Sequence, residues 1–264
     1  MKFSVKDILD NSFAVSVNPY RARCIREVFS YYGLPKPMIY NGFRNCDLKQ
    51  LFNGDEKHRQ RYANAYNCSL SHTGVIKMAK CLDLPYVAIF EDDAYPCRDI
   101  YKKLEEYSSN IPDDAGLVVL GWSRLVGKRI SNNDVYSEFS GKVYGSHAYI
   151  IFKSAYDKYL EYYHKHPKVA SDMMFNIKPS PFKVYIANKC LFIQYNFQRS
   201  NWGCIGYAYS ETAKVKSDPN PPLGFDRIES IVDVREFTPP SGPKQASIPP
   251  PKNNTRKIQF IMPA

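Results

Sequence analysis

Three adjacent carboxylates stand at the end of an apolar run, in the stretch YVAIFEDDAYP that covers residues 86–96. If the chain stays extended there, alternation puts Glu91 and Asp93 on one side and Asp92 on the other. Two oxygen ligands on one side suit Mg²⁺ or Mn²⁺, which bind one or two carboxylates together with phosphate oxygens. A solvated acidic turn would explain the same residues, so the pattern alone leaves both interpretations open.

A second polar group stands near the start of a predicted helix, where the stretch VNPYRAR contains Asn18, Arg21 and Arg23. Backbone N–H groups and the helix dipole favour phosphate at such a position, although a solvated helix start would look the same. The whole chain carries a formal charge of +10 at pH 7, with a pI of about 9.1. An anionic partner is therefore expected, such as nucleic acid, a lipid surface or a phosphorylated small molecule.

Strand-like and helix-like stretches alternate along the chain and would position these groups. Strands are predicted at 12–18, 85–90, 115–122 and 142–152, with one or two more within 182–196. Helices are predicted at 19–33, 66–84, about 98–109 and 153–166, and a further helix opens in 170–176 with Ser171 as its N-cap. Residues 34–62 have no sustained period and are interpreted as a loop region with one short strand at 37–40. This order predicts an α/β fold with a mostly parallel sheet and helices on both faces.

The 264 residues, 44% of them hydrophobic, are sufficient for a packed domain, which we place at residues 1–213. Residues 214–264 are rich in Pro, Ser, Asn and Lys and are predicted to form an extended or wrapping tail. No stretch approaches the length of a membrane span, so we expect a cytoplasmic protein. The scattered cysteines contain no CxxC pair and are interpreted as reduced thiols; they are residues 24, 46, 68, 81, 97, 190 and 204.

Five blocks together resemble glycosyltransferase family 25, the group of bacterial lipooligosaccharide galactosyltransferases and collagen galactosyltransferases. The resemblance covers roughly residues 13–205, and its blocks are VSVNPYRARCIREVFSYYGL, NCSLSHTGVIKMAKCLDLPYVAIFEDDA, LVVLGW, GSHAYIIFKSAYDKYL and SDMMF. It implies a GT-A fold with a Rossmann-like sheet, a UDP-hexose donor with galactose foremost, and inversion at the anomeric carbon. It also implies Mn²⁺ or Mg²⁺ as cofactor and a glycan or glycolipid acceptor, such as lipooligosaccharide or polysaccharide.

The resemblance also assigns roles to single residues. Glu91 and Asp93 become metal ligands, and Asp172 becomes the general base that deprotonates the acceptor hydroxyl. The donor-binding residues would be Asn18, Arg21, Ser71, His72, Asp92, Gly145 and Ser146. Two purely structural interpretations stay open: a hydrogen-bonded His72, and an Asp172 that interacts with a helix dipole. The five histidines end at His166, so the late histidine that completes the metal shell in many GT-A enzymes has no counterpart.

Two other classes of function fit part of the sequence. A GT-A fold that has lost turnover would be a binding or scaffold domain, although the intact EDD argues against it. A nucleic-acid-binding protein would explain the charge, the basic KHRQR stretch at 57–61 and the 21 tyrosines. The basic residues are spread without a stacking motif, so we expect no nucleic acid partner. A basic face is instead expected to contact the inner surface of the membrane peripherally.

Overall fold

The computed structural model describes residues 3–44, 53–131, 133–166, 171–176 and 181–194. The helices are α1 (Val5–Asp10), α2 (Pro19–Tyr31), α3 (Glu56–Cys81), α4 (Ile100–Ser109), α5 (Lys153–Lys165) and the 3-10 helix η2 (Ser171–Asn176). The strands are β1 (Ser12–Ser16), β2 (Met38–Asn41), β3 (Tyr86–Glu91), β4 (Ala94–Pro96), β5 (Ala115–Gly121), β6 (Arg124–Ser131), β7 (Tyr136–Tyr144), β8 (Ala148–Phe152), β9 (Lys183–Ala187) and β10 (Phe192–Gln194). The predicted tail at 214–264 lies outside the described residues.

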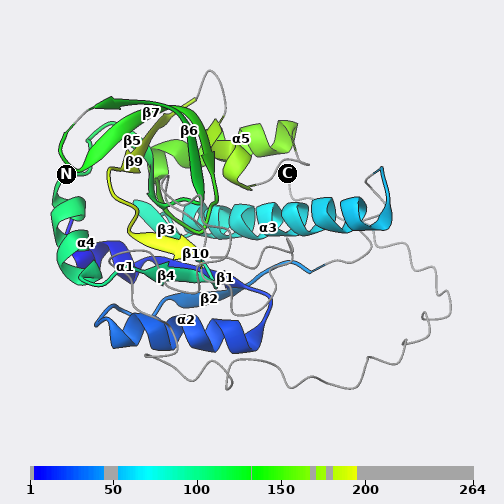
Figure 1. Cartoon of the computed structure of the whole chain (residues 1–264), viewed down its shortest axis with the longest axis horizontal. Helices are drawn as coiled ribbons and strands as arrows, with labels where there is room; N and C mark the ends of the chain where they lie inside the picture. Colours follow the sequence, from blue (N-terminus) through cyan, green and yellow to red (C-terminus); the bar gives the residue numbers. More distant parts are fainter. Residues whose placement is uncertain (1–2, 45–52, 132, 167–170, 177–180, 195–264) are drawn as a thin grey trace.

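The described strands form one sheet in the order β2-β1-β3-β8-β5-β9-β7-β6, with β10 pairing to β4 and β5 (Figure 1). The β2-β1-β3 group and the β5–β9 pair are parallel. Strand β8 runs antiparallel to both of its neighbours, β3 and β5, and the β6–β7 hairpin is also antiparallel. The predicted α/β class is confirmed. The sheet is mixed, however, with both parallel and antiparallel pairs, rather than mostly parallel.

Part of that error comes from residues 142–152, which were predicted as one strand. The structure divides them into the end of β7 and the whole of β8, separated by residues 145–147. Gly145 has a φ of +92°, a conformation that side chains with a Cβ rarely adopt, so the chain turns there. The break matters because it puts the residues of this turn beside the end of β3, to which β8 is paired.

Helices cover both faces of the sheet, as predicted. In the sheet β2 and β3 flank β1, so the connection from β1 to β2 runs in one direction across the sheet and the connection from β2 to β3 runs in the opposite direction. Right-handed crossovers in opposite directions put their helices on opposite faces. Figure 1 shows this arrangement, with α2 on one side of β1 and β2 and with α3 and α5 packed together on the other.

Local signals set the ends of α2. The Asn18 side-chain oxygen accepts hydrogen bonds from the backbone N–H groups of Tyr20, at 2.9 Å, and Arg21, at 3.4 Å. Pro19 occupies the first helical position, where its missing N–H costs nothing. The helix ends before Gly33, whose φ of +69° reverses the chain.

Helix α3 is longer than predicted, because residues 56–62 belong to it and not to a loop. Asp55 caps it by accepting a hydrogen bond from the His58 backbone N–H at 2.8 Å. Residues 56–62 are exposed or half-buried and therefore carry no apolar period, which is why the pattern did not reveal them. A helix at 171–176 is also present, but it is a 3-10 helix that begins at Ser171, so Ser171 lies inside it rather than before it.

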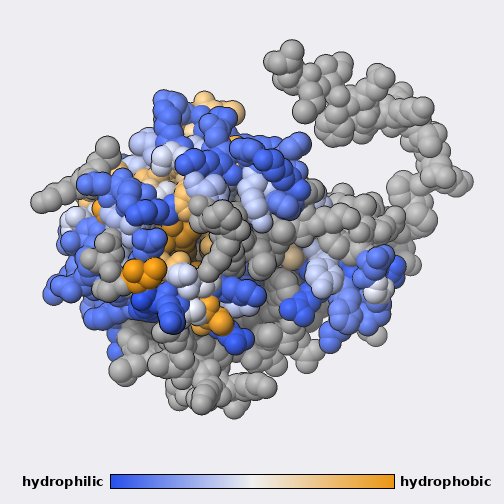
Figure 2. Space-filling view, turned by 90° about the horizontal axis from the view of Figure 1, so that it is seen from above, coloured by the Kyte–Doolittle hydropathy of each residue, from blue (hydrophilic) through white to orange (hydrophobic). Residues whose placement is uncertain are grey.

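One continuous apolar core lies between the sheet and its helices, and residues 87–90 of β3 are fully buried in it. In Figure 2 the described surface is mostly hydrophilic, with one hydrophobic area left of the centre and separate hydrophobic residues elsewhere. Among the described residues, no helix combines the length and the apolar character needed to cross a membrane. Peripheral contact with a membrane stays a prediction.

Candidate functional site

The acidic residues lie where β1 and β3 end side by side. The two strands are parallel, with Val15 opposite Glu91. Connections leave β1 and enter β3 on opposite faces of the sheet, which makes this pair a topological switch point, the usual place for a ligand in an open α/β sheet. The sequence predicted the carboxylates at the end of a strand, and the structure shows that the N-terminus of α2 lies at the same edge of the sheet.

The extended conformation stops at Glu91, because Asp92 and Asp93 form a turn before β4. The Asp92 backbone N–H donates to the Val15 carbonyl oxygen at 3.1 Å, which continues the pairing with β1. The alternation that would have put Glu91 and Asp93 on one side and Asp92 on the other therefore does not apply. Instead, Asp92 and Asp93 share one partner and Glu91 has others.

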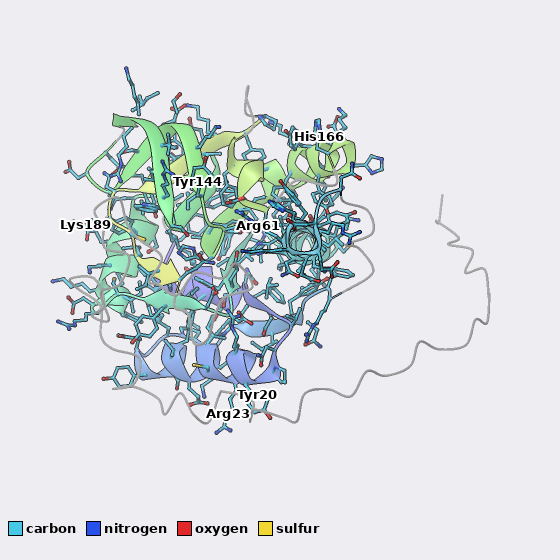
Figure 3. The ribbon with its side chains drawn as sticks, turned by 45° about the vertical axis from the view of Figure 1, so that its right-hand side comes forward. Tyr20, Arg23, Arg61, Tyr144, His166 and Lys189 are labelled. Carbon is cyan, nitrogen blue, oxygen red and sulfur yellow. The ribbon has the colours of Figure 1, made fainter. Side chains whose placement is uncertain are left out.

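That shared partner is Arg21, from the first turn of α2. Its Nη2 contacts Asp92 Oδ1 and lies 2.8 Å from Asp93 Oδ2. Ser16, the last residue of β1, donates from Oγ to Asp92 Oδ2 at 2.5 Å. Arg23, predicted to accompany Arg21, lies instead on the outer side of α2 and points away from the sheet (Figure 3). Within the described part of the chain, Arg21 thus contacts both aspartates of the acidic turn.

Glu91 contacts a serine, a glutamine and a histidine. Ser146 Oγ donates to Glu91 Oε1 at 2.7 Å, and Gln194 Nε2 donates to Oε2 at 3.2 Å. The His72 Nε2 atom lies 3.5 Å from Oε1, too far for a strong hydrogen bond but close enough for electrostatic attraction. These contacts come from β10, α3 and the turn between β7 and β8, so Glu91 joins three parts of the fold.

These different surroundings move the pKa values of the carboxyls in opposite directions. Burial alone would raise the pKa of Glu91, but His72, His147 and the Ser146 hydroxyl lower it to about 2. Burial raises the pKa of Asp92 to about 7, with Asp93 and Glu91 adding to the rise and with Arg21 and Ser16 opposing it. The pKa of Asp93 is also raised by burial, against the opposing effect of Arg21. Arg21 thus opposes the rise in the pKa values of both aspartates but does not offset the effect of their burial.

The turn between β7 and β8 also reaches the predicted base. The Gly145 backbone N–H donates to Asp172 Oδ2 at 3.1 Å, and Ser146 Oγ lies 2.6 Å from the Ser171 hydroxyl. A Cβ on Gly145 would lie only 2.7 Å from Ser123 Oγ, so glycine allows the close approach. His147 is fully buried, and its Nε2 donates to the Phe192 carbonyl at 2.9 Å.

Three predicted donor-binding side chains already make hydrogen bonds within the fold. The Ser71 hydroxyl donates to the Asn67 carbonyl at 2.7 Å and accepts from the Phe43 N–H at 2.8 Å, so it connects α3 to the segment after β2. Asn18 caps α2 through its side-chain oxygen. His72 is fully buried, with its Nδ1 2.9 Å from the Tyr149 hydroxyl. Their roles in binding a donor stay predictions.

The acidic turn fits a hard divalent cation at one atom in particular. Asp93 Oδ1 is buried and has no hydrogen-bond partner among the described residues. A buried carboxylate oxygen without a partner is costly, and a cation would relieve that cost. Both oxygens of Glu91, in contrast, already accept hydrogen bonds. Asp93 therefore fits the predicted ion better than Glu91 does.

Four residues near the acidic turn were not predicted to belong to the site: Ser16, Cys68, Ser171 and Gln194. Ser16 could have been found as a polar residue that ends a buried strand beside the acidic one. Cys68 stands four residues before His72, a spacing that puts both on one face of a helix. Ser171 was predicted only as a cap, and Gln194 reaches Glu91 across 103 positions of sequence, which no local pattern indicates.

Comparison with known proteins gives little further guidance. No family model matches the sequence, and no curated protein matches it. Among solved structures, a glycosyltransferase involved in the glycosylation of the major capsid of PBCV-1 is similar at 9% identity and a TM-score of 0.39. That similarity covers 66% of this chain and 80% of the other. A TM-score this low carries no argument about fold or function.

Proposed function

We propose that this protein is a GT-A-type glycosyltransferase that moves a hexose, with galactose as the first candidate, from a UDP-sugar to a surface glycan. The observation that carries the proposal is the acidic turn at the switch point of β1 and β3, with Arg21 and the start of α2 beside it. An anionic diphosphate fits such a place, because a helix N-terminus and an arginine oppose its charge. The sequence resemblance supplies the sugar, the UDP moiety and the inverting stereochemistry.

In this proposal Asp93 and Glu91 would hold Mn²⁺ or Mg²⁺. Asp93 offers the buried Oδ1 atom that lacks a partner among the described residues. When bound, the cation would neutralise the charge that develops on the departing diphosphate. Arg21 keeps the neighbouring Asp92 and Asp93 in place and adds a fixed positive charge to the same end of the sheet.

Asp172 is the proposed general base. Its Oδ2 accepts the Gly145 N–H at 3.1 Å, which orients the carboxylate beside the turn that carries Ser146. A carboxylate in this role takes the proton from the acceptor hydroxyl as that hydroxyl attacks the anomeric carbon. Gly145 and Ser146 would then contact the donor sugar, while Asp92 and Asn18 would lie toward the nucleotide.

A turnover assay tests the proposal directly. The full chain with Mn²⁺ is expected to release UDP from UDP-galactose, faster when a glycan acceptor is present. Asp172→Asn is expected to lower kcat by about 10²-fold or more and to retain donor binding, since a positioned base contributes that much. Asp93→Ala should lose the metal-dependent activity. Full turnover by Asp93→Ala with saturating metal and donor would disprove the metal role.

A second candidate is a GT-A-fold protein that binds a sugar nucleotide without turning it over. One observation favours it: Arg21 contacts both aspartates and so already supplies the positive charge that a catalytic metal would bring. This candidate predicts that a UDP-sugar binds equally well with and without Mn²⁺ and that no UDP is released. The enzyme predicts metal-dependent binding and release.

A further inference from the structure

A cysteine, a histidine and a glutamate meet beside the acidic turn. The ligand atoms of Cys68, His72 and Glu91 all lie within 4.8 Å of one another, and no other such group of three or more residues occurs in the described part of the chain. Cys68 and His72 are four residues apart on α3, so they share the helix face that meets the end of β3. We propose that these three residues form a second metal site, one that takes Zn²⁺.

The spacing of the three atoms is close to that of a zinc site. The His72 Nε2 atom is 3.5 Å from Glu91 Oε1, and Cys68 Sγ is 4.0 Å from the same oxygen. A tetrahedral ion with bonds of about 2.0 Å to nitrogen and oxygen and about 2.3 Å to sulfur separates its ligands by roughly 3.3–3.6 Å. The two separations from Glu91 Oε1 need at most about half an ångström of contraction, and the Cys68–His72 separation is within 4.8 Å, so side-chain rotation must draw the three atoms together around the ion.

His72 points independently to a ligand. It is fully buried, and its Nε2 atom has no hydrogen-bond partner among the described residues. Its other ring nitrogen lies 2.9 Å from the Tyr149 hydroxyl, and the two rings stack with centroids 5.7 Å apart. In the metal-free protein a proton on Nε2 would face Glu91, whereas a bound ion replaces that proton: with Nδ1 donating to Tyr149, the Nε2 lone pair then faces the ion between Glu91 and Cys68. Histidines that bind metals are commonly oriented in this way, by a hydrogen bond from the nitrogen that does not bind.

The chemistry of the donors selects the ion. A thiolate, an imidazole and a carboxylate suit Zn²⁺, whereas Mg²⁺ and Mn²⁺ prefer oxygen ligands. Binding requires the Cys68 thiol to give up its proton to solvent, so the affinity should rise with pH. Three protein ligands leave a fourth position for water or another oxygen. The ion would connect the middle of α3 to the end of β3.

This site shares only Glu91 with the cation site proposed for Asp93 and Glu91, and it does not depend on glycosyl transfer. Glu91 contributes Oε1 here, while its Oε2 is bonded to Gln194. The two metal sites can therefore be tested through residues that they do not share. Cys68 reports on zinc alone, and Asp93 reports on the hard cation alone.

Zinc content gives the test. The full chain is stripped with a chelator, incubated with Zn²⁺, passed through gel filtration and analysed by inductively coupled plasma mass spectrometry. We expect one zinc ion per chain for the wild type, for Asp93→Asn and for Cys81→Ser, which removes an exposed thiol from the same helix. Cys68→Ser and His72→Asn should lose it. The proposal is overturned if the wild type retains no zinc, or if Cys68→Ser retains as much as the wild type.

A second measurement needs no variant and covers the case in which Cys68→Ser does not fold. Co²⁺ bound to the stripped wild-type protein should give the near-ultraviolet charge-transfer band of a cobalt–thiolate bond. The metal should also slow alkylation of Cys68, followed by peptide mass spectrometry, while the exposed Cys81 reacts at an unchanged rate. A Co²⁺ complex without the thiolate band, or equal alkylation of Cys68 with and without metal, would overturn the proposal.

Discussion

Glu91 and the Asp92–Asp93 pair are neighbours in sequence but belong to different regions of the molecule. Glu91 is the last residue of β3, and neutral donors from β10 and from the turn after β7 surround it together with His72 from α3. Asp92 and Asp93 lie in the turn that follows, where one arginine from α2 contacts both. The first region favours the ionised carboxylate, with a pKa lowered to about 2. In the second region, burial raises the pKa of Asp92 to about 7.

The difference shows that the end of the strand, not the triplet itself, decides the role of each acid. Hydrogen-bond donors can surround Glu91 because it still lies in the sheet, next to β1 and β8. The chain turns after Glu91, so the carboxylates of Asp92 and Asp93 face the start of α2 and the Arg21 side chain. Neighbouring acids whose pKa values are driven apart can serve as different chemical groups at one pH. The following predictions test this difference between Glu91 and the Asp92–Asp93 pair.

Removal of the arginine should have the largest effect. Arg21→Ala leaves two largely buried carboxylates without their cation, and loss of one partner of such a group typically costs about 3–5 kcal/mol. We expect the free energy of unfolding, measured by urea denaturation of the metal-free protein, to fall by about that amount. Arg23→Ala, on the outer side of the same helix, should cost less than about 1 kcal/mol. Equal effects of the two variants would contradict the role given to Arg21.

The pH dependence of stability should reveal the raised pKa of Asp92 in the turn. Asp92 keeps its proton in the fold up to about pH 7, whereas the unfolded chain releases it near its ordinary value of 3.8. The free energy of unfolding should therefore decrease as the pH rises from about 4 to 7, by roughly 3 kcal/mol. Asp92→Asn has no proton to release, so the part of this decrease that Asp92 contributes should be absent, and the decrease should be clearly smaller than in the wild type. Asp99→Asn, at an exposed position without a side-chain cap bond, is the control and should keep it.

Urea titrations across this pH range, with a chelator present, would measure the effect. If Asp92→Asn and the wild type decrease in parallel, the raised pKa of Asp92 is wrong.

Glu91 should show the opposite dependence, over a lower range of pH. Its pKa in the fold is lowered to about 2 from an ordinary 4.5, so its stabilisation is complete above pH 4.5 and is lost as the pH falls toward 2. Glu91→Gln should remove this acid-range decrease and lower stability by roughly 2 kcal/mol at neutral pH. Acid denaturation followed by circular dichroism measures it. Glu105→Gln, at an exposed position of α4, should leave the acid midpoint unchanged.

Local patterns were enough to predict most of the elements that carry the site. Asn18 and Pro19 indicate a helix start because their own chemistry defines a cap, and the apolar run before Glu91 indicates a buried strand. The β6–β7 hairpin was not predicted, because its strands mix charged, polar and glycine residues such as Arg124, Gly127 and Lys128, without a clear period. The polar first half of α3 was missed for the same physical reason.

The contacts within the site could not be predicted in the same way. Arg21 reaches Asp92 from 71 positions away, Ser146 reaches Glu91 from 55, and Gln194 reaches it from 103. Such pairs depend on which strands are neighbours in the sheet, and residues 142–152 were predicted as a single strand. Once Gly145 divides that stretch, β8 lies beside β3 and the turn before it meets Glu91.

Donor binding tests the proposed site most directly. Thermal unfolding of the full chain is measured with UDP-galactose, UDP-glucose, a GDP-sugar and a CMP-sugar, each with and without Mn²⁺. A ligand at about 100 times its Kd stabilises the folded state by about 2.7 kcal/mol, which a rise in Tm reveals without any acceptor. We predict a rise with a UDP-sugar that requires Mn²⁺ and disappears in Asp93→Asn. No rise with any UDP-sugar, or an equal rise in Asp93→Asn, would contradict the assignment of the acidic turn as the donor site.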